Sequence, residues 1–216
     1  GVTQLDKLPV ETQAQNHFYD GWIYRNLLDP SLRGIRIRIS RLIPENSTVL
    51  DVGCGTGDQL FFISKQIKSG LGVELSEAMI NTCQEQARKR EITNCEFLLA
   101  DASNLTNMEN QTFDYTMTSM VIHEMPEEVR MPVLKEMMRI GKQLILVDWI
   151  YPQPPLMKKF STHLVERIAG KAHYAGFRSF MRQGGMPALI KTLGLDVVET
   201  QITGKGTIQL WVCRTP

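Results

Sequence analysis

One stretch constrains the fold of this chain more than any other: VLDVGCGTGDQL, residues 49–60. The apolar residues from Val49 to Val52 predict a short buried strand, and the pattern that begins at Gln59 predicts a helix. Between them, glycines alternate with other residues, so backbone of almost no side-chain volume can approach a ligand with its N–H groups free. The stretch therefore predicts a strand, a ligand-binding loop and a helix, with the loop glycines at Gly53, Gly55 and Gly57.

The glycine spacing disfavours two common phosphate-binding motifs. A dinucleotide fingerprint, G-x-G-x-x-G, needs its third glycine where this chain has Asp58. A Walker-type loop needs Gly-Lys-Ser/Thr, which does not follow here. Glu74 instead closes a second apolar run, where an acidic residue is placed to accept both hydroxyls of a ribose.

The motif DVGCGTG resembles the first motif of class I S-adenosylmethionine (SAM) methyltransferases, and further motifs of that family follow in order. They are Glu74, the sequence Ala100-Asp101-Ala102 after a third apolar run, and the residues from Ser119 to Glu124 after a fourth. The resemblance covers about residues 45 to 150 and implies SAM as cofactor and S-adenosylhomocysteine as product. It places Asp101 at the adenine amino group, with Leu75 and Met79 packed on the adenine. The expected cofactor-binding residues are Asp51, Gly53, Cys54, Gly55, Gly57, Glu74, Leu75, Met79, Asp101, Ala102 and Ser119.

Strand and helix patterns alternate from Val49 onward, which predicts a mostly parallel sheet with helices on both faces. The last two strand patterns, 196–201 and 206–212, flank Thr203-Gly204-Lys205-Gly206 and predict a hairpin. The fold class is thus α/β: a Rossmann-like sheet of seven strands with a C-terminal antiparallel hairpin, as the resemblance also implies. Helices are expected at 59–67, 76–90, 126–139 and 183–193, and a fifth strand at 144–147 that ends at Asp148.

We expect a single methyltransferase domain over residues 1–216. Its parts are an N-terminal helical cap (1–47), a SAM-binding core (48–155), a helical lid or substrate insert (156–182), and the last helix with the hairpin (183–216). The cap contains the alternating sequence Ile35-Arg36-Ile37-Arg38-Ile39, which is compatible with a strand. A helix is favoured because Asp29-Pro30 can start one and because Leu32, Ile35, Ile39, Leu42 and Ile43 share a helical face.

The N-terminal cap also contains aromatic residues that precede this helix pattern. Related enzymes often close an N-terminal aromatic residue or arginine over the methionine part of SAM. By this resemblance, Tyr19, Tyr24 and Arg25 are added to the expected cofactor site. The alternative is a helix that simply packs through Phe18, Trp22 and Ile23.

The composition limits the classes of function that fit the chain. A net charge of +1 gives no overall field that would attract nucleic acid. The 4 cysteines lack disulfide-framework or zinc spacing, so we expect no metal and a cytoplasmic location. No apolar run reaches the length of a membrane helix, and no basic apolar leader is present, although Gly1 in place of Met indicates a trimmed start. The expected partner is a small-molecule acceptor, with the protein a monomer or a homodimer.

His123 and Asp148 are the candidate catalytic residues. His123 follows the fourth strand, where it is expected to face the position of the transferred methyl group, and imidazole can accept a proton near neutral pH. Asp148, at the end of the fifth strand, could orient His123 or bind the acceptor. The alternative for His123 is a structural role, in which it only packs and forms hydrogen bonds. The alternative for Asp148 is an acid that lies in a solvated loop or forms a cap. Glu124 is expected to face solvent or to begin a helix.

Basic residues are unevenly distributed along the chain. Residues 156–182 hold 6 basic side chains and a single acid, and residues 30–44 hold 4 arginines and no acid. They are either solvated helix faces or cations that select an anionic substrate. The candidate substrate residues are His173, Tyr174, Arg178 and Arg182, the two arginines lying four positions apart, on one face if that stretch is helical.

The sequence favours a SAM-dependent methyltransferase that acts on a small molecule, with anionic or aromatic acceptors as candidates. The resemblance includes the broad group of quinone-biosynthesis C-methyltransferases, in cofactor motifs that do not identify the acceptor. A methyltransferase-like protein that binds SAM without turnover, in a regulatory or structural role, is the alternative. An NAD-linked oxidoreductase is disfavoured by the missing third glycine. Base methylation of nucleic acid is disfavoured because Thr118-Ser119-Met120-Val121 replaces an Asp/Asn-Pro-Pro-aromatic motif.

Overall fold

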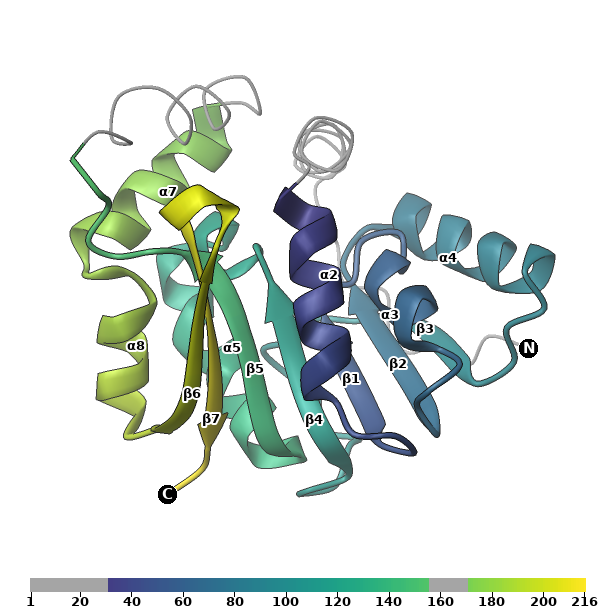
Figure 1. Cartoon of the computed structure of the whole chain (residues 1–216). Helices are drawn as coiled ribbons and strands as arrows, with labels where there is room; N and C mark the ends of the chain where they lie inside the picture. The colour runs from purple at the N-terminus through teal and green to yellow at the C-terminus, as the bar shows by residue number, and fades with distance from the viewer. Residues whose placement is uncertain (1–30, 156–170) are drawn as a thin grey trace.

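The computed structural model describes residues 31–155 and 171–216, and these form an α/β structure around a single sheet (Figure 1). Within this part of the chain the sheet has seven strands in the order β3-β2-β1-β4-β5-β7-β6. The first five are parallel, whereas β7 runs antiparallel to both β5 and β6. The strands are β1 (Thr48–Val52), β2 (Ser69–Glu74), β3 (Cys95–Leu99), β4 (Phe113–Ser119), β5 (Gly141–Trp149), β6 (Asp196–Thr203) and β7 (Ile208–Arg214).

Helices cover both faces of the sheet, which explains why its central strands are apolar throughout. Consecutive residues of a strand point to opposite faces, so Val49 packs in the apolar cluster on one face and Leu50 in the cluster on the other. The first face carries α2 (Ser31–Leu42), α3 (Asp58–Ile63) and α4 (Glu77–Lys89), and the second carries α5 (Glu127–Ile140) and α8 (Gly185–Leu193). In Figure 1, α2 lies in front of the sheet and α5 behind it.

The helix α7 (Lys171–Arg182) is placed differently from the others. Its Phe177 belongs to the apolar cluster on one face of the sheet and its Phe180 to the cluster on the other. It therefore crosses the edge of the sheet, beside the turn of 3-10 helix η1 (Ile122–Glu124) that follows β4. A second 3-10 turn, η2 (Gly204–Gly206), joins the two strands of the predicted hairpin.

The predicted fold class is confirmed, and several predicted boundaries change. The stretch 35–39 is part of the helix α2, with Ile35 and Ile39 buried, so its strand-like alternation was the weaker signal. Strand β5 runs from Gly141 to Trp149, longer at both ends than predicted and with Asp148 inside it. The helix predicted over 59–67 ends at Ile63, and that predicted over 183–193 begins at Gly185, because Gly184 and Gly185 adopt positive φ angles between α7 and α8.

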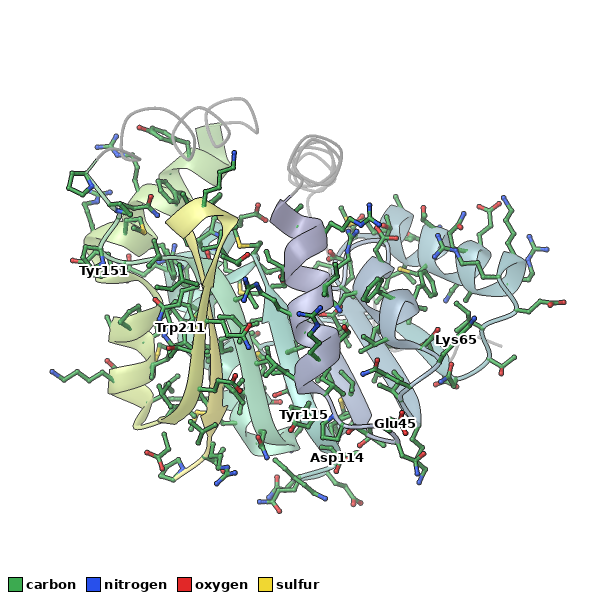
Figure 2. All side chains as sticks on the ribbon, in the orientation of Figure 1. Glu45, Lys65, Asp114, Tyr115, Tyr151 and Trp211 are labelled. Carbon is green, nitrogen blue, oxygen red and sulfur yellow. The ribbon has the colours of Figure 1, made fainter. Side chains whose placement is uncertain are left out.

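The strand order indicates where a ligand site lies on this sheet. The chain reverses direction across the sheet between β1 and β4, and the crevice beyond the carboxyl ends of such strands is where ligands bind in open α/β sheets. The glycine loop follows β1 and η1 follows β4, so both lie at this edge, whereas Asp114 and Tyr115 mark the opposite end of β4 (Figure 2). Among the described residues, none of the helices is long and apolar enough to cross a membrane.

Candidate cofactor site

The glycine loop between β1 and α3 is held in a conformation that other residues would strain. Gly53, Gly55 and Gly57 have φ angles of 71°, 58° and 85°, in the left-handed region. A Cβ atom on Gly53 would lie 2.7 Å from the side chain of Val121. The N–H groups of Gly53 and Cys54 both donate to the carbonyl of Val73, at 2.9 and 3.1 Å, which fixes the loop on β2.

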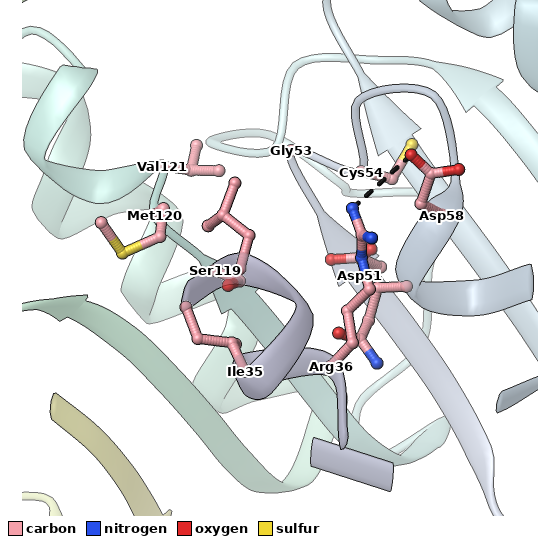
Figure 3. Close-up of a pocket in the computed structure, with 11 residues that line it drawn as sticks. Ile35, Arg36, Asp51, Gly53, Cys54, Asp58, Ser119, Met120 and Val121 are labelled. Atoms are coloured by element: carbon pink, nitrogen blue, oxygen red, sulfur yellow. Dashed lines mark ion pairs between the residues drawn. The ribbon is translucent and has the colours of Figure 1, made fainter. Parts of the chain in front are cut away.

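A cavity of about 70 Å³ lies directly beside this loop, and we call it the glycine-loop cavity (Figure 3). Asp51, Gly53 and Cys54 line it from β1 and the loop, and Ser119 from the end of β4. The helix α2 lies along one side of it, and Arg36 reaches from that helix to Asp58, with 3.6 Å between Nη2 and Oδ2. Sequence reasoning grouped Arg36 with the basic face of α2, because nothing in the local pattern shows which arginine turns toward the loop.

A second cavity, of about 190 Å³, lies on the other side of Gly53 and Val121, which line both, and we call it the Glu74 cavity. Its walls include Glu74, Leu75, Asp101 and Ala102, four residues that the sequence assigned to the cofactor. The side chain of Glu74 is buried, and one of its oxygens accepts the N–H groups of Leu75 and Ser76. The rest of the wall is apolar, as suits a flat aromatic ring.

Two buried carboxyl groups dominate the electrostatics of these cavities. Burial, with a smaller contribution from Glu74, raises the pKa of Asp51 from 3.8 to about 8. Burial also raises the pKa of Glu74, against the lowering effect of the N–H groups that it accepts. In the described part of the chain neither carboxyl group forms an ion pair with a basic side chain. A cationic ligand would stabilise these groups in their charged form, and a pyrophosphate would not.

The remaining predicted cofactor residues have different surroundings. Cys54 lines the glycine-loop cavity, and its thiol contacts that of Cys83, a hydrogen bond that together with burial raises the pKa of Cys54. Met79 is fully buried in α4, where its N–H donates to Ser76 Oγ, and it is not among the described residues that line either cavity. Packing of Met79 on the adenine is therefore not supported by this structure. Tyr19, Tyr24 and Arg25 lie outside the described residues.

His123 and Asp148 are brought together, as the sequence suggested. Asp148 Oδ1 lies 2.7 Å from His123 Nδ1, and Asp148 Oδ2 accepts the backbone N–H of His123 at 3.1 Å. Asp148 also accepts the N–H of Trp149. Among the described residues, the rings of Trp149, Phe177 and Phe180 pack around the imidazole, with centroids 6.0 to 6.3 Å away.

The surroundings of His123 and Glu124 correct two expectations. Both side chains of the His123–Asp148 pair are 0% exposed, and neither residue lines the two cavities described above. The imidazole of His123 lies instead between Trp149 of β5 and Phe177 and Phe180 of α7. Glu124 is buried as well, rather than solvent-facing, and its Oε1 lies 3.7 Å from His123 Nε2.

Arg130, which sequence reasoning missed, holds this region together. Its side chain is 1% exposed, and its Nε donates to the carbonyls of Ile122 and Met125 while Nη2 donates to that of Gly176 at 2.8 Å. It thereby ties η1 to α7. An arginine in an otherwise ordinary amphipathic helix gives no local signal of such burial.

The candidate substrate residues lie on α7, away from the glycine loop. Arg178 and Arg182 share one face of this helix, as expected, and both line a third cavity together with residues that follow β5. Tyr174 packs against the core and lies under the guanidinium of Arg178, 5.7 Å from ring centroid to Cζ. His173 lies within α7, but its side chain is outside the described part.

Comparisons with known proteins agree with this geometry. Residues 49–143 match a family model described as a methyltransferase domain. A demethylmenaquinone methyltransferase of Listeria welshimeri is 29% identical over 123 residues, 54% of this chain and 51% of the relative. An (S)-tetrahydroprotoberberine N-methyltransferase of Eschscholzia californica is 29% identical over 138 residues, 62% of this chain and 37% of the relative. The chain thus spans about half the length, or less, of these curated relatives.

A solved structure of a SAM-dependent methyltransferase from Aquifex aeolicus has the same fold, with a TM-score of 0.64. It is 21% identical, and the match covers 91% of this chain and 98% of that one. The fold and the glycine loop define a Rossmann-like protein whose candidate ligand site lies at the carboxyl ends of β1 and β4. More specifically, residues 49–143, which include the glycine loop, Glu74 and Asp101, are similar to a methyltransferase domain, and the described part of the chain shares the fold of the Aquifex aeolicus methyltransferase.

Proposed function

We propose that this protein transfers a methyl group from SAM to a small-molecule acceptor. The observation that carries the proposal is the pair of buried carboxyl groups, Asp51 and Glu74, beside a loop that glycine alone can form. The names of both curated relatives describe methyl transfer to small molecules, although they name different acceptors. These matches, which span 51% and 37% of the two relatives, support the activity without identifying the acceptor.

In this proposal the glycine-loop cavity holds the methionine part of the cofactor and the Glu74 cavity holds its adenosine. Bound SAM supplies a methyl group that is already activated by its sulfonium, so protein groups mainly align the reactants and exclude water. Asp51 offers negative charge near that sulfonium, and Glu74 accepts the ribose hydroxyls. Arg36 can exchange Asp58 for the carboxylate of the cofactor, since a guanidinium favours such paired oxygens. Leu75, Asp101 and Ala102 surround the adenine in this arrangement.

Titration calorimetry with SAM, S-adenosylhomocysteine and NAD tests the cofactor. We expect both adenosyl compounds to bind and NAD not to bind. The substitution Glu74→Ala should weaken adenosyl binding by about 1.5–3 kcal/mol, because it removes a charged acceptor of hydrogen bonds. Glu77→Ala, an exposed acid at the start of α4, is the control and should bind as the wild type does. Absence of adenosyl binding to the folded protein would contradict the proposal.

For His123 and Asp148 we propose a positioning role. Their hydrogen bonds hold η1 against β5, and η1 directly follows Met120 and Val121, which line the glycine-loop cavity. A pH profile of kcat separates this role from that of a general base. If His123 accepts the proton of the acceptor, His123→Asn abolishes the acid limb of the profile; if it positions η1, activity falls while the shape of the profile is kept.

The alternative function is SAM binding without turnover. It is favoured by the burial of His123, which leaves the predicted base out of contact with the cavities. Release of S-adenosylhomocysteine in the presence of a panel of phenol, amine and carboxylate acceptors decides between the two. A protein that binds SAM but forms no product with any acceptor would support the alternative.

A further inference from the structure

A third cavity, of about 340 Å³, opens beside α7, and none of its lining residues belongs to the two cofactor cavities. One wall is the segment Tyr151–Gln153, which follows β5, and the other is formed by Phe177, Arg178, Met181 and Arg182 of α7. We call it the α7 cavity. Its volume is in the range of small-molecule sites, which run from about 300 to 1,000 Å³.

Most of the lining surface of the α7 cavity is apolar, and part of it is aromatic. Phe177 is almost fully buried, whereas Tyr151 is 39% exposed and lies near the start of α8, where it packs on Gly185 (Figure 2). Met181 adds a flexible thioether, which adapts to the shape of a ligand. A flat, apolar molecule therefore matches the body of this cavity.

The charged residues that line this cavity in the described part of the chain are both cationic. Arg178 and Arg182 are exposed and lie one helical turn apart, and the sequence of α7 contains no acid. Neither guanidinium forms an ion pair within the described part of the chain. The guanidinium of Arg178 is stacked on Tyr174 and is therefore partly preorganised. Two such groups at this spacing suit a carboxylate, which accepts paired hydrogen bonds from guanidinium.

A layer of packed side chains lies between the α7 cavity and the glycine-loop cavity. Phe177 lines this cavity, and its ring lies 6.3 Å from those of His123 and Trp149. Met120, in the same apolar cluster, lines the glycine-loop cavity on the other side. Both cavities also lie at the edge of the sheet where the parallel strands end.

We propose that the α7 cavity binds an aromatic carboxylate, with its ring against Phe177 and Tyr151 and its carboxylate between Arg178 and Arg182. Given the function proposed above, this aromatic carboxylate is the methyl acceptor itself or a portion of a larger acceptor. In the second case it anchors that acceptor beside the glycine-loop cavity. The cavity then selects acceptors by their negative charge. In this proposal SAM binds at the glycine loop, independently of the ligand in the α7 cavity.

Calorimetric titration with 2-naphthoate and its neutral isostere 2-naphthamide tests this site. We expect wild-type protein to bind one naphthoate. The double substitution Arg178→Gln/Arg182→Gln should weaken naphthoate binding by about tenfold or more, because it removes two charged donors. Naphthamide binding should change by less than about twofold. The matched control is Arg33→Gln/Arg41→Gln, which removes two exposed arginines of α2 and should leave the binding of both probes unchanged.

Two outcomes would overturn the site: no binding of either probe at millimolar concentration, or equal naphthoate affinity in the double variant and the wild type. Titration of the same samples with SAM keeps the two proposals apart. Arginine-dependent naphthoate binding without SAM binding upholds the site and contradicts methyl transfer. SAM binding without naphthoate binding contradicts the site and leaves the cofactor proposal intact.

Discussion

Asp51 is fully buried at the end of β1, and no basic side chain in the described part of the chain neutralises it. With a pKa of about 8, it is mostly protonated at neutral pH when the cavity holds no cation. A sulfonium beside it would favour the carboxylate, so binding of SAM should release a proton. The residue would then distinguish SAM from its neutral-sulfur product.

The affinity for SAM should therefore depend on pH through Asp51. Between pH 6 and 8 the affinity for SAM should rise, by at most about tenfold per pH unit, and it should level off above the pKa of Asp51. The substitution Asp51→Asn should abolish the rise, and S-adenosylhomocysteine should show a smaller one. Calorimetry in buffers of different ionisation enthalpy measures the released proton. An unchanged pH dependence after this substitution would refute the role of the carboxyl group.

Replacing a helical glycine by alanine should have opposite effects on the free energy of unfolding in α2 and in α7. Gly34 in α2 has space for a methyl group, since the nearest atom to an added Cβ is Thr203 Oγ1 at 3.8 Å. Gly176 in α7 lies against η1, where an added Cβ would be 3.0 Å from the carbonyl oxygen of His123. Gly34→Ala should therefore raise the free energy of unfolding by up to about 1 kcal/mol. Gly176→Ala should lower it by about 1 kcal/mol or more, and urea denaturation of both variants checks the signs.

The contact between α7 and η1 also depends on Arg130. Arg130→Met keeps the volume of the side chain but leaves the buried carbonyls of Ile122, Met125 and Gly176 without this donor. We expect a loss of about 3 kcal/mol in the free energy of unfolding. Lys135→Met, an exposed position in the same helix, should change it by less than about 0.5 kcal/mol. Similar values for the two variants would show that Arg130 does not join these elements.

The stability of the whole molecule should depend on pH in the window set by the buried acids. Folding raises the pKa of Asp51 from 3.8 to about 8, so the folded state binds more protons than the unfolded state between about pH 4 and pH 8. The stabilisation from its protonated form is complete below about pH 4 and is lost as the pH rises to 8. Glu74, whose pKa is also raised, acts in the same direction. Asp114 and Glu136, whose pKa values are lowered by hydrogen bonds, act in the opposite direction but below this window.

Without cofactor, the free energy of unfolding should therefore fall between pH 5 and 8, by at most about 1.4 kcal/mol per pH unit for one group. Asp51→Asn should flatten this fall, and SAM should reduce it by neutralising the carboxylate. Urea unfolding across this range is the measurement. A wild type whose stability rises from pH 5 to 8 would contradict the assignment.

The sequence grouped many of the residues that line the two cavities at the glycine loop, because these residues belong to local motifs. Asp51, the loop glycines and Glu74 end or follow strands, and the ends of parallel strands must meet at one edge. Met79 was also assigned to the cofactor but lines neither cavity, because a position one turn into a helix does not reveal which way the side chain turns. Arg36 and Arg130 were missed because their partners lie more than one helical turn away in sequence or in other elements.

Short-range patterns of apolar residues and glycine were enough to predict the fold class, the glycine loop and the acid at the end of β2. The surroundings of His123 and Glu124 could not be predicted in this way, because η1 has few residues and takes its orientation from the packing of β5, α5 and α7. Tertiary packing also places Arg178 and Arg182, which are both exposed, in the lining of a cavity. Such a cavity forms between distant segments, and no single segment contains the information to predict it.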